Sequence, residues 1–142
     1  MTVAAVAERD GRFLLVQEVI GGQSVLNQPA GHLEPGEDLL TAVVRETLEE
    51  TAWHFRPTAL VGLYRWQQPQ AERTFLRVTF SGECTAQVPG RELDTGIERA
   101  LWLGWPEIQQ RAAMLRSPMV LRCIEDYLAG HAYPLALLND VE

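Results

Sequence analysis

Residues 28–53 read QPAGHLEPGEDLLTAVVRETLEETAW, a turn-rich segment followed by an uninterrupted helix-forming run. Two glycines and two prolines within residues 28–37 predict a loop rather than a strand or a helix. Glu37 and Asp38 favour a helix N-terminus at this point, because carboxylates stabilise its free N–H groups. Neither glycine nor proline follows before Thr51, so we expect one helix over residues 38–51.

The predicted helix carries two stripes that lie beside each other. The side expected to pack against a sheet holds Leu40, Val44, Leu48 and Thr51. The neighbouring side holds Glu46, Glu49 and Glu50, whose i, i+3, i+4 spacing brings their carboxylates together. Such carboxylates repel one another unless a cation lies between them, and their oxygens suit Mg²⁺ or Mn²⁺. A solvated acidic helix face is the alternative interpretation of this spacing.

The same segment resembles the Nudix box, G-x5-E-x7-R-E-U-x-E-E-x-G-U, where U is a bulky aliphatic residue. Six fixed positions agree with it: Gly31, Glu37, Arg45, Glu46, Glu49 and Glu50. Two later positions depart, because Thr47 replaces an aliphatic residue and Ala52 replaces the glycine after the helix. A left-handed helix cap would strain alanine, so Ala52 puts the geometry of the helix end in question. Over about residues 2–138 the chain is also similar to the NudJ-like branch of small bacterial Nudix phosphatases.

This resemblance implies an α/β (α+β) Nudix fold, with a mixed β-sheet sandwiched between helices and the box forming a loop–helix–loop. It also implies a metal-dependent hydrolase that cleaves phosphoanhydride bonds. Its substrates would be nucleoside di- or triphosphates, or thiamine-type (hydroxymethylpyrimidine, thiamine) pyrophosphates. Mg²⁺ would be the cofactor, with Mn²⁺ as an alternative. Other activities in the enzyme class are cleavage of ADP-ribose, dinucleotides or oxidised nucleotides. A non-catalytic nucleotide-binding sensor is the alternative of another class, but such domains typically lose box carboxylates and this chain retains them.

The resemblance also assigns roles to residues of the box. Metal ligands would be Glu46, Glu49, Glu50 and the carbonyl oxygen of Gly31. Arg45 and Glu49 are the catalytic candidates within the box, although a purely structural pairing of Arg45 with the box carboxylates is the alternative. Glu37 can serve either the metal or the helix dipole, and His32 is interpreted as structural rather than as a base.

The resemblance also implies one more carboxylate from the loop before Trp102, as an extra ligand or as the general base. The loop offers Glu92, Asp94 and Glu98. We select Glu98, because it lies nearest to the predicted strand that follows.

Four residues are expected to contact the substrate: Tyr64, Trp66, Arg77 and Arg116. Aromatic rings can stack on a substrate ring, and guanidinium groups suit phosphate oxygens. Core packing and ordinary ion pairs are the alternative interpretations of these side chains.

The composition predicts one domain over residues 1–142. The resemblance implies a small-molecule nucleotide or pyrophosphate as partner, in a monomer or a homodimer. A net charge of −7 and 12 scattered arginines argue against binding to nucleic acid. No segment has the composition of a signal peptide or of a membrane span, so we expect a cytoplasmic protein without a membrane partner. Cys84 and Cys123 are too far apart in sequence for a metal-binding pair and are expected to be free thiols.

The rest of the chain predicts strands before and after the box helix and two helices at the C-terminal end. The expected strands are residues 2–7, 12–18, 59–66 and 74–80, with another from Ala100. A polar, turn-rich segment covers residues 84–96, and the expected helices are residues 106–115 and 117–128.

Overall fold

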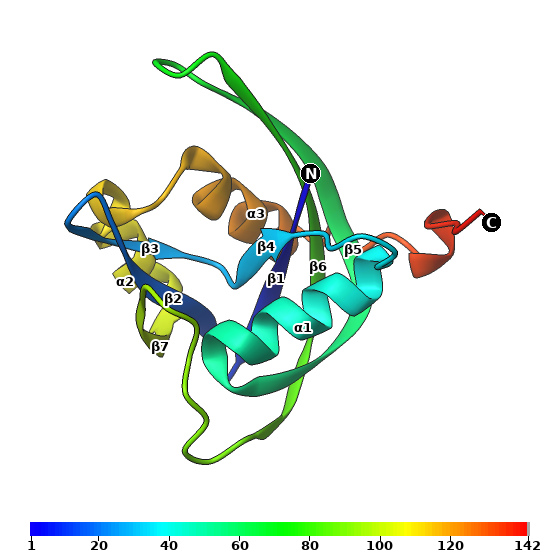
Figure 1. Ribbon diagram of the computed structural model, residues 1–142, viewed down its shortest axis with the longest axis horizontal. Coiled ribbons are helices and arrows are strands. Elements are labelled where there is room, and N and C mark those ends of the chain that lie inside the picture. Colours follow the sequence, from blue (N-terminus) through cyan, green and yellow to red (C-terminus); the bar gives the residue numbers. More distant parts are fainter. Residues whose placement is uncertain (142) are drawn as a thin grey trace.

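The computed structural model describes residues 1–141 and contains a mixed seven-stranded sheet with helices on both faces (Figure 1). In chain order the strands are β1 (Thr2–Arg9), β2 (Arg12–Ile20), β3 (Gln23–Asn27), β4 (Ala30–His32), β5 (Trp53–Gln68), β6 (Arg73–Gln87) and β7 (Ile97–Gly104). The helices are α1 (Leu39–Thr51), α2 (Trp105–Gln110) and α3 (Pro118–Leu128), and the short 3₁₀ helices are η1 (Ala112–Met114) and η2 (Leu135–Leu137). The predicted mixed sheet between helices is confirmed.

Strand β1 lies at the centre of the sheet and explains the mixed pairing. It runs parallel to β6 and antiparallel to β2 and β4. Its side chains alternate between the faces: Val3 and Ala5 pack in the core under α1, whereas Val6 packs in the core under α3. Because β4 pairs with β1, the residues that begin the box are fixed to the middle of the sheet.

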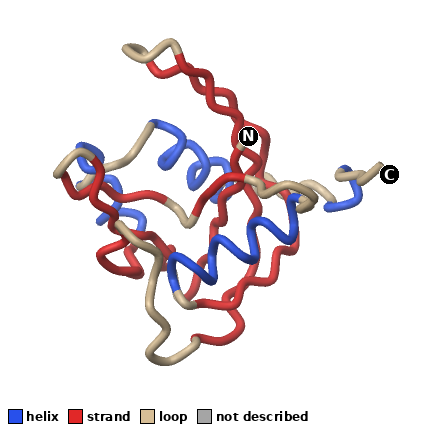
Figure 2. Tube along the Cα trace, viewed as in Figure 1, coloured by secondary structure: helices blue, strands red, loops and turns tan. Residues whose placement is uncertain are grey.

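Strands β5 and β6 form a long two-stranded ribbon whose tip extends past both helical layers (Figure 2). The register places Trp66 opposite Phe75 and Tyr64 opposite Arg77. Directly opposed residues of an antiparallel pair point to the same face, so these four side chains share one side of the ribbon. That side is the one that α3 covers near Tyr64.

Helix α1 begins and ends where the sequence indicates. Asp38 is the N-cap, and its carboxylate accepts a hydrogen bond of 2.7 Å from the Thr41 N–H. Of the four residues in the predicted buried stripe, Thr51 is fully buried, Leu40 and Val44 are partly buried and pack against the core, and Leu48 is partly buried. The buried residues are Ala42, Val43, Thr47, Glu50 and Thr51. Thr47 therefore occupies a core position, where its hydroxyl donates to the Val43 carbonyl at 2.7 Å and is satisfied.

Ala52, which stands where the box has glycine, adopts a left-handed conformation with φ 64° and ψ 15°. Its N–H donates to the Leu48 carbonyl at 2.9 Å, so the helix closes as a glycine cap would close it. The Cβ atom of a non-glycine residue is strained in this conformation by roughly 1 kcal/mol.

Replacing Ala52 by glycine is expected to raise the free energy of unfolding by about 0.5 kcal/mol, because relief of strain exceeds the added chain entropy. Urea denaturation measures the change. Ala129→Gly is the matched control, since Ala129 also caps a helix but has an ordinary φ of −76°. The free energy of unfolding is expected to fall in Ala129→Gly. An equal fall in Ala52→Gly would contradict the strain argument.

Several element boundaries differ from the sequence-based prediction. Residues 30–32 form strand β4 instead of loop, because β1 offers them backbone partners. Strands β5 and β6 are longer than expected, since they pair from Trp53 opposite Gln87, and this also removes residues 84–87 from the predicted turn region. The predicted helix over residues 106–115 breaks after Gln110, and the Arg116 N–H donates instead to the Leu26 carbonyl of β3. No helix in residues 1–141 is both long enough and apolar enough to cross a membrane.

Candidate active site

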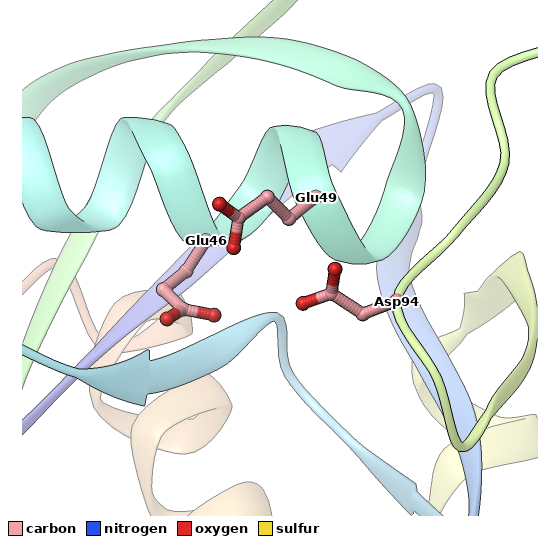
Figure 3. A group of neighbouring side chains, drawn as sticks. All are labelled: Glu46, Glu49 and Asp94. Carbon is pink, nitrogen blue, oxygen red and sulfur yellow. The ribbon is translucent and has the colours of Figure 1, made fainter.

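Three carboxylates from two separate segments converge beside α1 (Figure 3). Glu46 and Glu49 come from the helix, and Asp94 comes from the loop between β6 and β7. One oxygen of each lies within 4.8 Å of the others. Oxygens on opposite sides of a bound Mg²⁺ lie about 4 Å apart, so this group has the dimensions of a divalent-cation site.

Gly31 in β4 leaves the space that Glu46 occupies. A Cβ atom added at Gly31 would lie 2.1 Å from the carboxylate carbon of Glu46, which no side chain could tolerate without displacing it. The absence of a side chain therefore lets the Glu46 carboxylate lie against the backbone of β4. The close packing of a glutamate on glycine, with oxygen donors only, fits a hard cation such as Mg²⁺ or Mn²⁺.

Glu50 lies one helical turn beyond Glu46 and is almost enclosed, with 9% of its surface exposed. Its carboxylate accepts a hydrogen bond of 2.9 Å from the Ala30 N–H. Burial raises the pKa of Glu50 to about 8, and it also raises the pKa of Glu46. Neighbouring carboxylates add to both effects, whereas Arg45 opposes the rise in the pKa of Glu46. A cation bound here would favour the ionised forms.

Arg45 joins the loop to the helix through charged hydrogen bonds. Its Nε and Nη2 atoms donate to both oxygens of Glu37, at 2.6 and 2.8 Å. Its Nη1 atom donates to Glu46 at 2.8 Å and to Glu49 at 3.2 Å. The bond from Arg45 lowers the pKa of Glu37 to about 2, so this pair is ionised at neutral pH. Arg45 thus directs its donors at the protein's own groups, an arrangement that positions carboxylates.

The structure does not bring Glu98 to the carboxylate group. Glu98 is exposed and accepts hydrogen bonds from Ser24 and Gln17 on the far side of β2 and β3. Asp94, which the sequence offered as an alternative, takes the place expected for Glu98. Its N–H donates to the Glu49 carbonyl at 3.0 Å, which ties the loop to the end of α1. The Asp94-Thr95-Gly96 turn, with Gly96 at φ 94°, is a sequence signal that could have favoured Asp94 over Glu98.

A pocket of about 170 Å³ opens next to this group, between β4, the β5–β6 ribbon and the start of α3. Three of the four predicted substrate contacts line it: Trp66, Arg77 and Arg116. Gly31 and His32 form the wall nearest the carboxylates. Tyr64 does not reach the pocket, because its hydroxyl donates to Asp126 of α3 at 2.8 Å and fastens the helix to β5.

Phe75 also lines the pocket. Its ring stacks on Trp66 with 5.6 Å between ring centroids and 27° between ring planes. Both rings line the pocket, so its outer end is aromatic while its inner end carries Arg77.

Comparisons with known proteins agree with this architecture. The NUDIX domain family matches residues 1–123. Phosphatase NudJ of Escherichia coli K12 is 39% identical over 140 residues, which cover 99% of this chain and 90% of that protein. A NUDIX hydrolase from Nitrosomonas europaea is 51% identical with a TM-score of 0.96, covering 99% of this chain and 95% of the other.

A more distant structure shares the fold alone. It is the NUDIX domain of Shewanella oneidensis NrtR, solved with ADP ribose, at 20% identity and a TM-score of 0.73, covering 91% of this chain and 86% of that one. The family match over most of the chain and the near-complete alignment with NudJ agree with the box residues gathered around Gly31. The chain therefore belongs to the Nudix family of hydrolases.

Proposed function

We propose that this chain is a divalent-cation-dependent phosphatase that hydrolyses the terminal phosphoanhydride bond of small organic pyrophosphates. Its substrates are nucleoside di- or triphosphates, or thiamine-type pyrophosphates. The observation that carries the proposal is the group of Glu46, Glu49 and Asp94 together with a pocket lined by aromatic rings and arginines, because Gly31 both lies against Glu46 and lines that pocket. The similarity to phosphatase NudJ supports release of inorganic phosphate rather than cleavage deeper in the substrate.

Each group of the site has a role in this proposal. Glu46, Glu49, Glu50 and the carbonyl oxygen of Gly31 would hold Mg²⁺ or Mn²⁺. When bound, the cation neutralises phosphate oxygens and acidifies a water molecule. Glu49 and Asp94 orient that water for attack on phosphorus and accept its proton, so that phosphate and the shortened substrate are released.

The decisive test is a substrate panel with Mg²⁺, assayed separately for phosphate, pyrophosphate and nucleoside monophosphate. The panel includes nucleoside di- and triphosphates, hydroxymethylpyrimidine and thiamine pyrophosphates, ADP-ribose and a dinucleoside polyphosphate. Phosphate as the first product, and loss of turnover with EDTA, are the expected results. Release of pyrophosphate, or cleavage of ADP-ribose alone, would contradict the proposal.

Asp94→Asn is expected to lower kcat/KM by about 10- to 100-fold, because the water loses one of its two orienting carboxylates. Glu98→Gln is the matched control: it removes one negative charge from the start of β7, four residues after Asp94, and is expected to change kcat/KM less than twofold. Initial rates of phosphate release at several Mg²⁺ concentrations measure both. A larger loss of kcat/KM in Glu98→Gln than in Asp94→Asn would contradict the role of Asp94 and favour Glu98, the residue selected from the sequence.

A further inference from the structure

Arg77 is a buried cation without a counter-ion. Only 4% of its surface is exposed. Its Nη1 and Nη2 atoms donate to neutral amide oxygens, at 2.9 Å to Gln28 and 3.3 Å to Asn27, and its buried Nε atom has no hydrogen-bond partner. In the part of the chain that the structure describes, no carboxylate lies within 4.0 Å of this guanidinium. The more distant Glu18 carboxylate offsets the burial of this charge only in part, since burial still lowers the pKa of Arg77. A buried charge whose hydrogen-bond partners are all neutral destabilises a fold, so the position calls for an anion.

The pocket beside Arg77 is positive although the chain as a whole is negative. Its described lining contains two guanidinium groups, from Arg77 and Arg116, and no aspartate or glutamate. The formal net charge of the chain is −7. An anion that approaches the acidic molecule would therefore be held here by charge that nothing else in the pocket neutralises.

Strand β4 connects this positive pocket with the carboxylate group. The Ala30 N–H donates to Glu50 and the Glu46 carboxylate lies against Gly31, while Ala30, Gly31 and His32 line the pocket. A substrate that lies along β4 would place its reacting phosphoryl group towards the carboxylates and its retained phosphoryl group towards the arginines. A guanidinium recognises phosphoryl oxygens in this way without a metal ion, through charge-assisted hydrogen bonds.

We propose that Arg77, assisted by Arg116, forms an anion subsite that works without a metal and binds the phosphoryl group retained by the organic product. This inference rests on the proposed function, because it assigns a place to the part of the substrate that is not released. A neutral ring carbonyl would accept hydrogen bonds from Arg77 but would leave its charge uncompensated. The stacked Trp66 and Phe75 rings at the outer end leave room for the organic group beside that phosphoryl group.

The test measures binding in EDTA, so that it does not depend on turnover. The probes are inorganic phosphate, a nucleoside monophosphate and the matching nucleoside, each titrated by calorimetry or by ³¹P and ¹H NMR. The wild-type protein is expected to bind both phosphates, and to bind the monophosphate at least about 10-fold more tightly than the nucleoside. Arg77→Gln is expected to abolish this preference.

Arg65→Gln is the matched control. Arg65 is exposed and lies opposite Leu76, so this variant removes one positive charge from the other face of the same ribbon. Arg116→Gln serves as a second variant if Arg77→Gln does not fold, and it is expected to weaken phosphate binding severalfold. Phosphate binding that is equal in all three variants, or absent from the wild type at tens of millimolar, would overturn the subsite.

The two phosphate probes distinguish a site for free phosphate ion from a site for the phosphoryl group of the substrate. Binding of inorganic phosphate but not of the monophosphate would mean that the pocket accepts only a free ion, and would overturn the assignment to the substrate. Turnover with Mg²⁺ is measured independently. A protein that binds the monophosphate through Arg77 but hydrolyses no pyrophosphate would contradict the proposed function and leave the subsite intact.

Discussion

Substituting glutamine for Glu50 is expected to lower kcat/KM for the preferred pyrophosphate by about 10³-fold or more at saturating Mg²⁺, with the fold retained. The side chain lies almost enclosed against β4 and receives the Ala30 N–H at 2.9 Å. Glutamine can accept the same hydrogen bond but cannot supply the negative charge that would hold a cation. Rates of phosphate release measure the loss of activity, and far-UV circular dichroism measures whether the fold is retained. Glu125→Gln, on the exposed side of α3, is the control and should leave both unchanged. An undiminished rate in Glu50→Gln would show that Glu50 is not a ligand of the catalytic cation.

The same substitution also tests the electrostatics of the metal-free protein. The folded-state pKa of Glu50 is about 8 against an ordinary value of 4.5, and burial is the main cause. Below the ordinary value the group is neutral in both states. As the pH rises through this window, the unfolded chain releases the proton first, so stability is lost until the pH exceeds the folded-state value.

Wild-type protein in EDTA is therefore expected to lose roughly 2–4 kcal/mol of unfolding free energy between pH 5 and pH 8 from this group, and Glu50→Gln is expected to lose much less. Urea denaturation at the two pH values measures the difference. The stabilisation that Mg²⁺ gives to the wild type should grow over the same range, since the cation binds the ionised carboxylate. Identical pH profiles for the two proteins would show that another group titrates.

The box could be predicted from the sequence because its chemistry is local. The spacing of Glu46, Glu49 and Glu50 on one helix fixes their mutual distances whatever the rest of the fold does. The burial of Glu50 could not be predicted in this way. Hydrophobic periodicity assigns polar residues to the solvent side, and a functional carboxylate under the helix breaks that rule.

The positions of the site residues outside the box depend on contacts between segments that are far apart in the sequence, so they could not be predicted from local patterns. Asp94 reaches the site because β6 continues to Gln87 and the following loop returns to the Glu49 carbonyl, whereas Glu98 is drawn away to Ser24. Tyr64 and Trp66 share one face of β5, and their sequence pattern is equivalent. Only the contact of Tyr64 with Asp126, 62 residues later, decides that Trp66 lines the pocket and Tyr64 does not.

Substitution of Arg45 is expected to have the second large effect, because this one side chain lies within 4.0 Å of four carboxylates. It binds Glu37 through two hydrogen bonds and also contacts Glu46 and Glu49, and its Nη2 atom donates to the His32 carbonyl at 3.1 Å. These bonds hold the turn-rich loop against the helix. Without Arg45 the carboxylates would repel one another, and Glu37 would lose its main hydrogen-bond donor.

Arg45→Gln is accordingly expected to lower the unfolding free energy by about 2 kcal/mol in EDTA and turnover by about 100-fold. Arg45→Lys keeps the charge but cannot donate to both oxygens of Glu37, so intermediate values are expected. Mg²⁺ should restore part of the stability of Arg45→Gln, because a cation between Glu46 and Glu49 replaces part of the missing charge. Arg122→Gln is the control: its ion pair with Asp126 is 65% exposed on the arginine side and should contribute less than about 1 kcal/mol. Equal losses in Arg45→Gln and Arg122→Gln, without any response to Mg²⁺, would mean that Arg45 is an ordinary surface ion-pair partner and that the carboxylates keep their places unaided.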